Sequence, residues 1–289
     1  MTLNISMEFA AMRNSRCLRS IMVFVVSAVA LSATSEAGFG QLNAVPQAAS
    51  VQDANGGLVI CGGGRMPDSV FKCFRDLAGN QPQLVVIPTA SIRADDSNYA
   101  KATIELWATR GFKNVVIIHT RDRKIADSDE FVKPLNSASA VWIGGGSQSK
   151  IAAAYLGTQT EEALYRVQKR GGVIGGTSAG AAVMSKIMIA SGSPNPIIKT
   201  GFDLLKDAIV DQHFVKRKRQ SRLESAVKSH PRLTGYGIDE GTALVVKQRV
   251  KRVIGKSTVT TIQFNGTSFV VRSHTPGTTI IETEITDSK

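Results

Sequence analysis

A glycine-rich turn at residues 175–180 holds Ser178, the residue of this chain best placed for chemistry. The pattern Gly176-x-Ser178-x-Gly180 follows a short apolar run and precedes residues 181–189, which the sequence predicts to be helical. A sharp strand-to-helix turn exposes a serine hydroxyl, and the N–H group that follows faces a developing oxyanion. The same turn also occurs without chemistry or as a phosphate-binding helix N-terminus. The motif alone leaves these three interpretations open.

Four histidines are candidates for the base that a serine nucleophile needs. They are His119, His213, His230 and His274. His213 follows the apolar residues 208–210, so we expect it at the end of a strand, and it lies in the chain between Ser178 and Glu240. His119 also ends an expected strand and stays open as an alternative. The position of His213 between a serine and an acidic residue favours it as the base.

A cluster of arginines follows His213 directly. Its members are Arg217, Arg219 and Arg222. The chain has a formal net charge of +12, and most of this excess falls within residues 211–256. A solvated basic face, a nucleic-acid patch and a pocket for carboxylates are all open interpretations. The neighbouring histidine favours the carboxylate pocket, because a guanidinium binds a carboxylate through two parallel hydrogen bonds.

Three blocks of the sequence resemble the cyanophycinase family within the peptidase E group. They are Gly175-Gly176-Thr177-Ser178-Ala179-Gly180-Ala181-Ala182, Asp211-Gln212-His213-Phe214 with Arg217, Arg219, Arg222 and Leu223, and Gly237-Ile238-Asp239-Glu240-Gly241-Thr242-Ala243-Leu244. Two shorter glycine-rich blocks, at residues 62–64 and 143–148, add to the match. The resemblance is specific because the second and third blocks are long and unusual.

The resemblance implies both a fold and a set of site residues. The fold is a flavodoxin-like sheet similar to that of class I glutamine amidotransferases. The triad consists of Ser178 as nucleophile, His213 as base and Glu240 as the carboxylate that orients the histidine. The substrate pocket is formed by Gln148, Asp211, Gln212, Arg217, Arg219 and Arg222. Family members hydrolyse cyanophycin, a poly-L-aspartate chain carrying arginine, to β-Asp-Arg dipeptides without a metal or cofactor, and they are often homodimers.

These roles predict which groups bind the oxyanion and which bind the substrate. The backbone N–H groups of Gly145, Gly146 and Ala179 are expected to hold the oxyanion. One arginine is expected to bind a substrate carboxylate, and Asp211 to meet a substrate guanidinium. Ser147 departs from the family, which often has an acidic residue at this position, and the change weakens the case for recognition of a basic group.

Two other functions compete with the cyanophycinase interpretation. Peptidase E relatives use aspartate as the third triad member and cleave short α-aspartyl peptides, so an aspartyl dipeptidase is one alternative. A non-catalytic basic protein that binds nucleic acid or an anionic surface is the other. The three blocks favour a peptide or polypeptide substrate rich in aspartate and arginine, and we expect no nucleic-acid partner.

Short apolar runs alternate with helical patterns in the first two thirds of the chain. Runs that predict buried strands lie at residues 58–61, 84–87, 115–118, 140–143 and 172–174, and helical patterns at residues 97–110 and 149–170. This alternation predicts an α/β fold with a mostly parallel sheet flanked by helices, whose site lies at the carboxyl ends of the strands. Residues 243–247, 249–254, 259–264 and 268–272 predict antiparallel hairpins, with a turn at Asn265-Gly266.

The first 55 residues do not share this pattern. A basic stretch, an apolar run at residues 21–31 and the sequence Ser35-Glu36-Ala37 predict a cleavable signal peptide over residues 1–37. A flexible leader is expected at residues 38–55 and a single α/β peptidase domain at residues 56–289. The apolar run is shorter than the roughly 20 residues that span a membrane. We therefore expect export to the periplasm or the extracellular space, with no membrane segment in the mature form.

The cysteines and histidines bear on whether the chain has a disulfide or a metal site. Cys61 and Cys73 fall in the expected mature chain, where one disulfide and two free thiols are equally open. The sequence has no Cys-x-x-Cys motif and only four histidines, which gives a metal site little support. A hydrophobic fraction of 43% and a charged fraction of 20% are typical of a soluble globular protein.

Overall fold

A computed structural model describes residues 56–281 of the 289-residue chain. The expected signal peptide and leader lie outside the described residues. Within residues 56–281, no helix is long and apolar enough to cross a membrane. The same residues contain no group of three or more His, Cys, Asp or Glu side chains placed to hold a metal ion. Cys61 and Cys73 are free thiols, and burial raises the pKa of Cys61.

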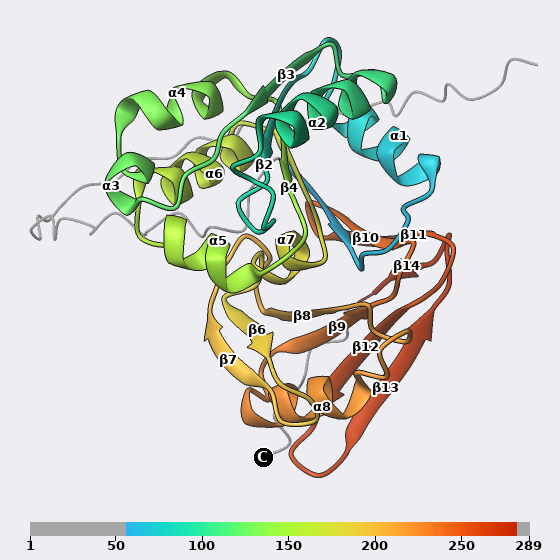
Figure 1. The fold of residues 1–289 in the computed structure, drawn as a ribbon. Helices are drawn as coiled ribbons and strands as arrows, with labels where there is room; N and C mark the ends of the chain where they lie inside the picture. Colours follow the sequence, from blue (N-terminus) through green and yellow to red (C-terminus); the bar gives the residue numbers. More distant parts are fainter. Residues whose placement is uncertain (1–55, 282–289) are drawn as a thin grey trace, which may run out of the picture. The chain divides into compact units, whose positions relative to one another are not determined.

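An eight-stranded mixed sheet forms the centre of the fold, in the order β14-β11-β10-β1-β5-β4-β2-β3 (Figure 1). Its parallel part consists of β1 (Gly57–Cys61), β2 (Gln83–Ile87), β3 (Asn114–Ile117), β4 (Ala140–Ile143) and β5 (Val173–Thr177). Its antiparallel edge consists of β10 (Thr242–Lys247), β11 (Val250–Gly255) and β14 (Thr279–Ile280). The expectation of a mostly parallel sheet with hairpins near its C-terminal end is confirmed.

Helices cover both faces of this sheet, which explains its continuous apolar strands. On one face lie α1 (Asp68–Leu77) and α2 (Ser97–Thr109), packed on Val59 and Trp142. On the other face, around Ile60 and Ile143, lie α3 (Arg123–Ala126), α4 (Asp129–Ser137), α5 (Gln148–Tyr155), α6 (Gln159–Lys169) and α7 (Ala179–Ala182). Each fully buried aliphatic side chain contributes roughly 1.5–3 kcal/mol to the stability of the folded state. The sheet is therefore a rigid base for its loops.

A second, four-stranded sheet has the order β13-β12-β9-β8. Its strands are β8 (Ala208–Gln212), β9 (Thr234–Ile238), β12 (Val259–Phe264) and β13 (Phe269–His274). Tyr236 and Ile238 belong to the same apolar cluster as one face of the main sheet. The opposite face of the second sheet packs against α8 (Gln220–Ser229) through Leu223 and Val227. The predicted turn at Asn265-Gly266 joins β12 to β13, with Gly266 at φ +90°.

The structure corrects the expectation for residues 181–189. Helix α7 ends at Ala182, and Ile187–Ser191 forms strand β6, paired with β7 (Ile197–Thr200). The Ser185 hydroxyl bonds the carbonyls of Ala182 and Ile187, 3.2 and 3.1 Å away. A serine that bonds the backbone in this way competes with helix propagation, and the Ile-Met-Ile sequence after it favours a strand.

Residues 149–170 also differ from the single helical pattern expected. They form two helices, α5 and α6, separated near Gly157, which has φ +67°. The hydroxyl of Thr158 accepts a hydrogen bond from the N–H group of Thr160, so Thr158 caps the N-terminus of α6. A glycine in the left-handed region followed by a threonine cap ends one helix and begins the next.

Candidate active site

Ser178 occupies the sharp turn between β5 and α7. Its backbone has φ 52° and ψ −110°, a strained conformation that costs about 1–3 kcal/mol. The N–H group of Ser178 donates to the carbonyl of Cys61 at 3.0 Å. A Cβ atom on Gly176 would lie 2.5 Å from the carbonyl oxygen of Gly180, so the turn needs a glycine there. The strain and the close packing hold the serine side chain at the carboxyl end of the sheet.

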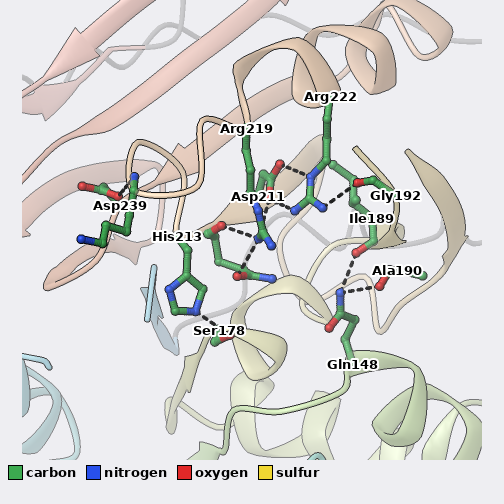
Figure 2. A network of polar contacts seen from close by, with 12 residues as sticks. Gln148, Ser178, Ile189, Ala190, Gly192, Asp211, His213, Arg219, Arg222 and Asp239 are labelled. Carbon is green, nitrogen blue, oxygen red and sulfur yellow. Dashed lines mark hydrogen bonds and ion pairs between the residues drawn. The ribbon is translucent and has the colours of Figure 1, made fainter. Parts of the chain in front are cut away.

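Three side chains from three strand ends form a hydrogen-bonded chain. The Oγ atom of Ser178 lies 3.0 Å from Nε2 of His213, and Figure 2 shows these two side chains pointing toward each other. The Nδ1 atom of His213 lies 2.6 Å from Oε1 of Glu240. Ser178 follows β5 of the main sheet, whereas His213 and Glu240 follow β8 and β9 of the second sheet. The site is therefore assembled where the two sheets meet.

The loop at residues 62–64 holds the histidine and the glutamate in place. The N–H group of His213 donates to the carbonyl of Gly62 at 2.7 Å. Gly63 has φ +103°, and a Cβ atom there would overlap the ring of His213. A Cβ atom on Gly64 would lie 2.9 Å from Glu240. The glycines of this loop thus allow its backbone to lie directly against both side chains.

The environment of His213 favours the neutral form of its imidazole. Burial lowers the pKa of His213. The hydrogen bond that Nδ1–H donates to Glu240 raises this pKa, and the nearby charge of Arg217 lowers it further. A neutral imidazole at pH 7 can accept the hydroxyl proton of Ser178. With Nδ1–H donated to Glu240, the free lone pair of Nε2 faces the serine. The arrangement supports general-base chemistry.

A buried ion-pair network lies beside the histidine (Figure 2). Arg222 donates to both carboxylate oxygens of Asp211, with the Nε–Oδ2 distance at 2.7 Å. Arg219 donates through Nη1 to the carbonyl oxygen of Gln212 at 2.6 Å and to its side-chain oxygen at 2.9 Å. Asp211 and Arg222 are only 1% and 4% exposed.

These contacts change the role expected for Asp211. Its carboxylate meets the guanidinium groups of Arg222 and Arg219, whereas the sequence predicted a substrate guanidinium. Nη1 of Arg222 also donates to the carbonyl of Gly192, in the loop between β6 and β7, at 2.9 Å. Asp211 therefore joins strand β8 to helix α8 and fixes the direction of both arginines.

The other two predicted pocket residues differ in exposure. Gln148 is buried, and its Nε2 donates to the carbonyls of Ile189 and Ala190 at 2.9 and 2.8 Å. These bonds fasten the start of α5 to strand β6. Arg217 is exposed, in the segment that follows His213, and its N–H group donates to the His213 carbonyl at 2.9 Å. Arg217 is thus free to meet a group that arrives from solvent.

The backbone of Gly145 lies near the side chain of Ser178. A Cβ atom on Gly145 would lie 3.5 Å from the Cβ atom of Ser178. Among residues 56–281, the N–H groups of Gly145, Gly146 and Ala179 donate no hydrogen bond to another group. The N–H group of Ser147 donates to the carbonyl of Ala90 at 3.0 Å, which fixes this loop. Unpaired N–H groups next to a serine hydroxyl suit a developing oxyanion.

The remaining histidines lie in other hydrogen-bond networks. His119 contacts Asp95 and Thr89, and His274 contacts Thr261. His230 contacts the carbonyl of Ala226 at the end of α8. Of the four histidines, all within the described residues, His213 is the one whose ring reaches Ser178.

Asp239 has a role that the sequence did not indicate. Its carboxylate accepts hydrogen bonds from the backbone of Lys216 at 2.9 Å and from the hydroxyl of Ser257 at 2.8 Å. Because Asp239 precedes Glu240, these bonds hold the end of β9 where Glu240 reaches His213. The sequence showed only that two acidic residues, Asp239 and Glu240, are adjacent. It did not reveal the hydrogen-bond partners of Asp239.

Comparison with known proteins places these residues in a family. The profile of Peptidase family S51 matches residues 58–254, a range that contains Ser178, His213 and Glu240. The cyanophycinase of Synechococcus elongatus is 31% identical over 81% of this chain and 76% of its own length. The cyanophycinase of Nostoc sp. (strain PCC 7120 / SAG 25.82 / UTEX 2576) is 35% identical over 67% of each chain.

A solved structure shares the fold. The crystal structure of a peptidase from an acI-B1 Actinobacterium aligns with a TM-score of 0.59 at 24% identity and covers 78% of this chain and 96% of its own. At this identity the match bears on the fold alone. The family profile and the two cyanophycinases show that the chain belongs to Peptidase family S51 and is a serine-type peptidase.

Proposed function

We propose that this chain is an exported, cyanophycinase-like serine exopeptidase. It hydrolyses multi-L-arginyl-poly-L-aspartate to β-Asp-Arg dipeptides through a triad of Ser178, His213 and Glu240. The observation that carries this proposal is the pair of hydrogen bonds that joins the three side chains, at 3.0 and 2.6 Å. The relatives named cyanophycinase support the choice of substrate.

The triad geometry supports a two-step acyl transfer. His213 accepts the proton of Ser178 while the serine oxygen attacks the scissile carbonyl carbon of the aspartate backbone. The carbonyl oxygen becomes an oxyanion next to the N–H groups of Gly145 and Ala179. The C–N bond then breaks, and the imidazolium of His213 gives its proton to the leaving amine. A water molecule, deprotonated by His213, hydrolyses the acyl-enzyme and restores the serine.

Glu240 supports both steps without changing its own protonation. Its Oε1 atom accepts the Nδ1–H bond of His213, which selects the tautomer with a free Nε2 lone pair. When the imidazolium forms, the carboxylate stabilises its charge. The 2.6 Å contact is typical of a charge-assisted hydrogen bond.

The arginines support recognition of a substrate carboxylate. Arg219 uses only Nη1 in its hydrogen bonds within the described residues, so its remaining N–H groups are available. Burial lowers the pKa of Arg219 to about 10, because a cation is poorly solvated there. A bound carboxylate would offset this lost solvation. Exposed Arg217 is the second candidate donor.

One assay separates this function from its alternatives. Purified protein is incubated with insoluble cyanophycin and, separately, with an α-aspartyl dipeptide, and products are identified by mass spectrometry. We expect β-Asp-Arg from the polymer and little turnover of the dipeptide, with neither reaction in Ser178→Ala. Rapid dipeptide turnover without polymer cleavage would instead indicate an aspartyl dipeptidase. No turnover of either, together with salt-sensitive retention of DNA, would indicate a basic binding protein.

A further inference from the structure

A cavity of about 740 Å³ lies between α1 and α2, on the face of the main sheet opposite α6. Two of its lining residues belong to the active site's surroundings. Thr177 precedes Ser178 in the chain, and a Cβ atom on Gly64 would touch Glu240. The cavity therefore borders the reacting groups, on a different side from the network around Asp211.

The lining of this cavity is strongly basic. It contains Arg65, Lys72, Arg75 and Arg110, against a single acidic residue, Asp68. Lys72 and Arg75 share Asp76, at 2.6 and 3.8 Å. Within the described residues, the guanidinium groups of Arg65 and Arg110 form no hydrogen bond or ion pair with another group. Two guanidinium groups thus border a cavity with their hydrogen-bond donors unused.

Two aromatic rings hold the guanidinium group of Arg110 in place. Its guanidinium carbon lies 3.4 Å from the ring centroid of Phe71 and 4.9 Å from that of Trp107. The residue is half-buried, and burial lowers the pKa of Arg110 although the charge of Asp68 opposes this. A guanidinium stacked on aromatic rings keeps its N–H edge in a fixed direction and loses little freedom on pairing. The edge is suited to a carboxylate, which it can bind through two hydrogen bonds.

The apolar part of the lining suits a peptide chain rather than a free ion. Trp142 and Met66 are buried, and Leu106 is exposed at 49%. A carboxylate-bearing chain can place methylene groups against these side chains while its charges meet the arginines. The volume is also in the range of pockets that hold small organic ligands.

We propose that this cavity binds free carboxylates along the polymer chain that extends from the bond cleaved at Ser178. The inference rests on the proposed function, because it places the non-reacting part of cyanophycin beside α1 and α2, with the α-carboxylates of its arginine residues as the groups that are bound. Arg65 and Arg110 are the residues that bind the carboxylates. The cavity acts as an extended subsite that raises affinity for long substrates and leaves the chemical step unchanged.

The test is a binding measurement with the full chain carrying Ser178→Ala. Fluorescein-labelled hexa-L-aspartate is titrated, and anisotropy gives Kd. Arg65→Gln and Arg110→Gln, each added to Ser178→Ala, should weaken binding about tenfold, since each removes a charge-assisted hydrogen-bond donor. Arg65 is exposed, so its variant keeps the packing of Phe71 even if Arg110→Gln disturbs it. Circular dichroism checks that both variants fold.

A control on the opposite face separates the cavity from general charge attraction. Lys169→Gln removes one exposed charge from α6 and should leave Kd unchanged. If Arg65→Gln and Arg110→Gln bind as tightly as the parent, or if Lys169→Gln weakens binding equally, the proposal is wrong. An oligothymidylate that displaces the peptide at a lower concentration than unlabelled hexa-L-aspartate does would also overturn it.

Failure of the proposed function gives a different pattern. If cyanophycin is not hydrolysed but hexa-L-aspartate binding depends on Arg65 and Arg110, the carboxylate site stands and the polymer assignment falls. If cyanophycin is hydrolysed, each arginine variant in the active enzyme should raise KM for the polymer severalfold at unchanged kcat. A change in kcat with no change in KM would contradict a role in extended binding.

Discussion

At the scale of single residues, the proposed mechanism depends on the protonation of His213. Burial and Arg217 both favour the neutral imidazole, and Glu240 favours the charged one, with a net lowering of the His213 pKa. The proposed mechanism requires the neutral imidazole, so kcat/KM should be maximal above the pKa of His213 and fall as the pH drops through it. The acid limb of the profile is therefore expected below the ordinary histidine value of about 6.5.

Arg217→Ala should move this acid limb to higher pH. Removing the positive charge takes away one cause that lowers the pKa of His213, so protonation then begins at a higher pH. The measurement is kcat/KM for hydrolysis from pH 4.5 to 8. Lys228→Ala, which removes an exposed charge at the other end of α8, should leave the limb in place. A limb that moves to lower pH in Arg217→Ala would contradict this electrostatic account.

At the scale of elements, the glycine loop at residues 62–64 predicts a sharp difference between two substitutions. Gly63→Ala should remove most activity, because a Cβ atom there overlaps the ring of His213. Gly79→Ala is the matched control: φ is +81° and no atom lies within 4 Å of the added Cβ. Each change costs about 1–3 kcal/mol of backbone strain. Urea unfolding should show a comparable loss of stability, whereas kcat/KM should fall sharply in Gly63→Ala alone.

The ion pair between β8 and α8 leads to a prediction about stability. Asp211→Ala leaves the guanidinium of Arg222, 4% exposed, without its carboxylate, which should cost about 3–5 kcal/mol of unfolding free energy. Adding Arg222→Met to Asp211→Ala should recover part of that loss. Glu130→Ala breaks an exposed pair with Lys133 and should have little effect. Urea denaturation measures all four proteins, and a loss in Asp211→Ala as small as that in Glu130→Ala would show that the pair is not needed.

Some elements could be predicted from the sequence because their pattern is local. The parallel strands appear in the sequence as short apolar runs that end in glycine or small polar residues, and Ser178 follows one of these runs. Strand β9 has the sequence Thr-Gly-Tyr-Gly-Ile, which lacks such a run. Its glycines make room for neighbours: a Cβ atom on Gly237 would lie 2.5 Å from the ring of Phe214. This requirement comes from tertiary packing and is invisible in a single sequence.

At the scale of the whole molecule, two sheets supply one site. The main sheet provides Ser178, and the second sheet provides His213 and Glu240, with Tyr236 and Ile238 in the apolar cluster that both sheets share. From the sequence, the order of these residues was readable, but the separate second sheet was not, because its pairing joins segments far apart in the chain. The pairing of Asp211 with Arg222 depends on the same assembly.

The proposed export is also tested with the whole chain. If the signal peptide ends at Ala37, protein produced from the full chain in a Gram-negative host should appear in the periplasm and begin at Gly38. N-terminal sequencing of the recovered protein measures this directly. A version with Arg13, Arg16 and Arg19 changed to glutamate should stay in the cytoplasm, because the basic stretch before the apolar run is lost. Recovery of uncleaved protein from the cytoplasm with the original sequence would contradict export.

A covalent probe tests most directly whether Ser178 is the nucleophile activated by His213. The protein is treated with a fluorophosphonate, digested, and the modified residue located by tandem mass spectrometry. We expect stoichiometric modification of Ser178, because its hydroxyl is 3.0 Å from Nε2 of His213. Hydrolytic activity should fall in proportion to the fraction of Ser178 that is modified. Modification of a different serine, or full hydrolytic activity after Ser178 has been modified, would contradict it.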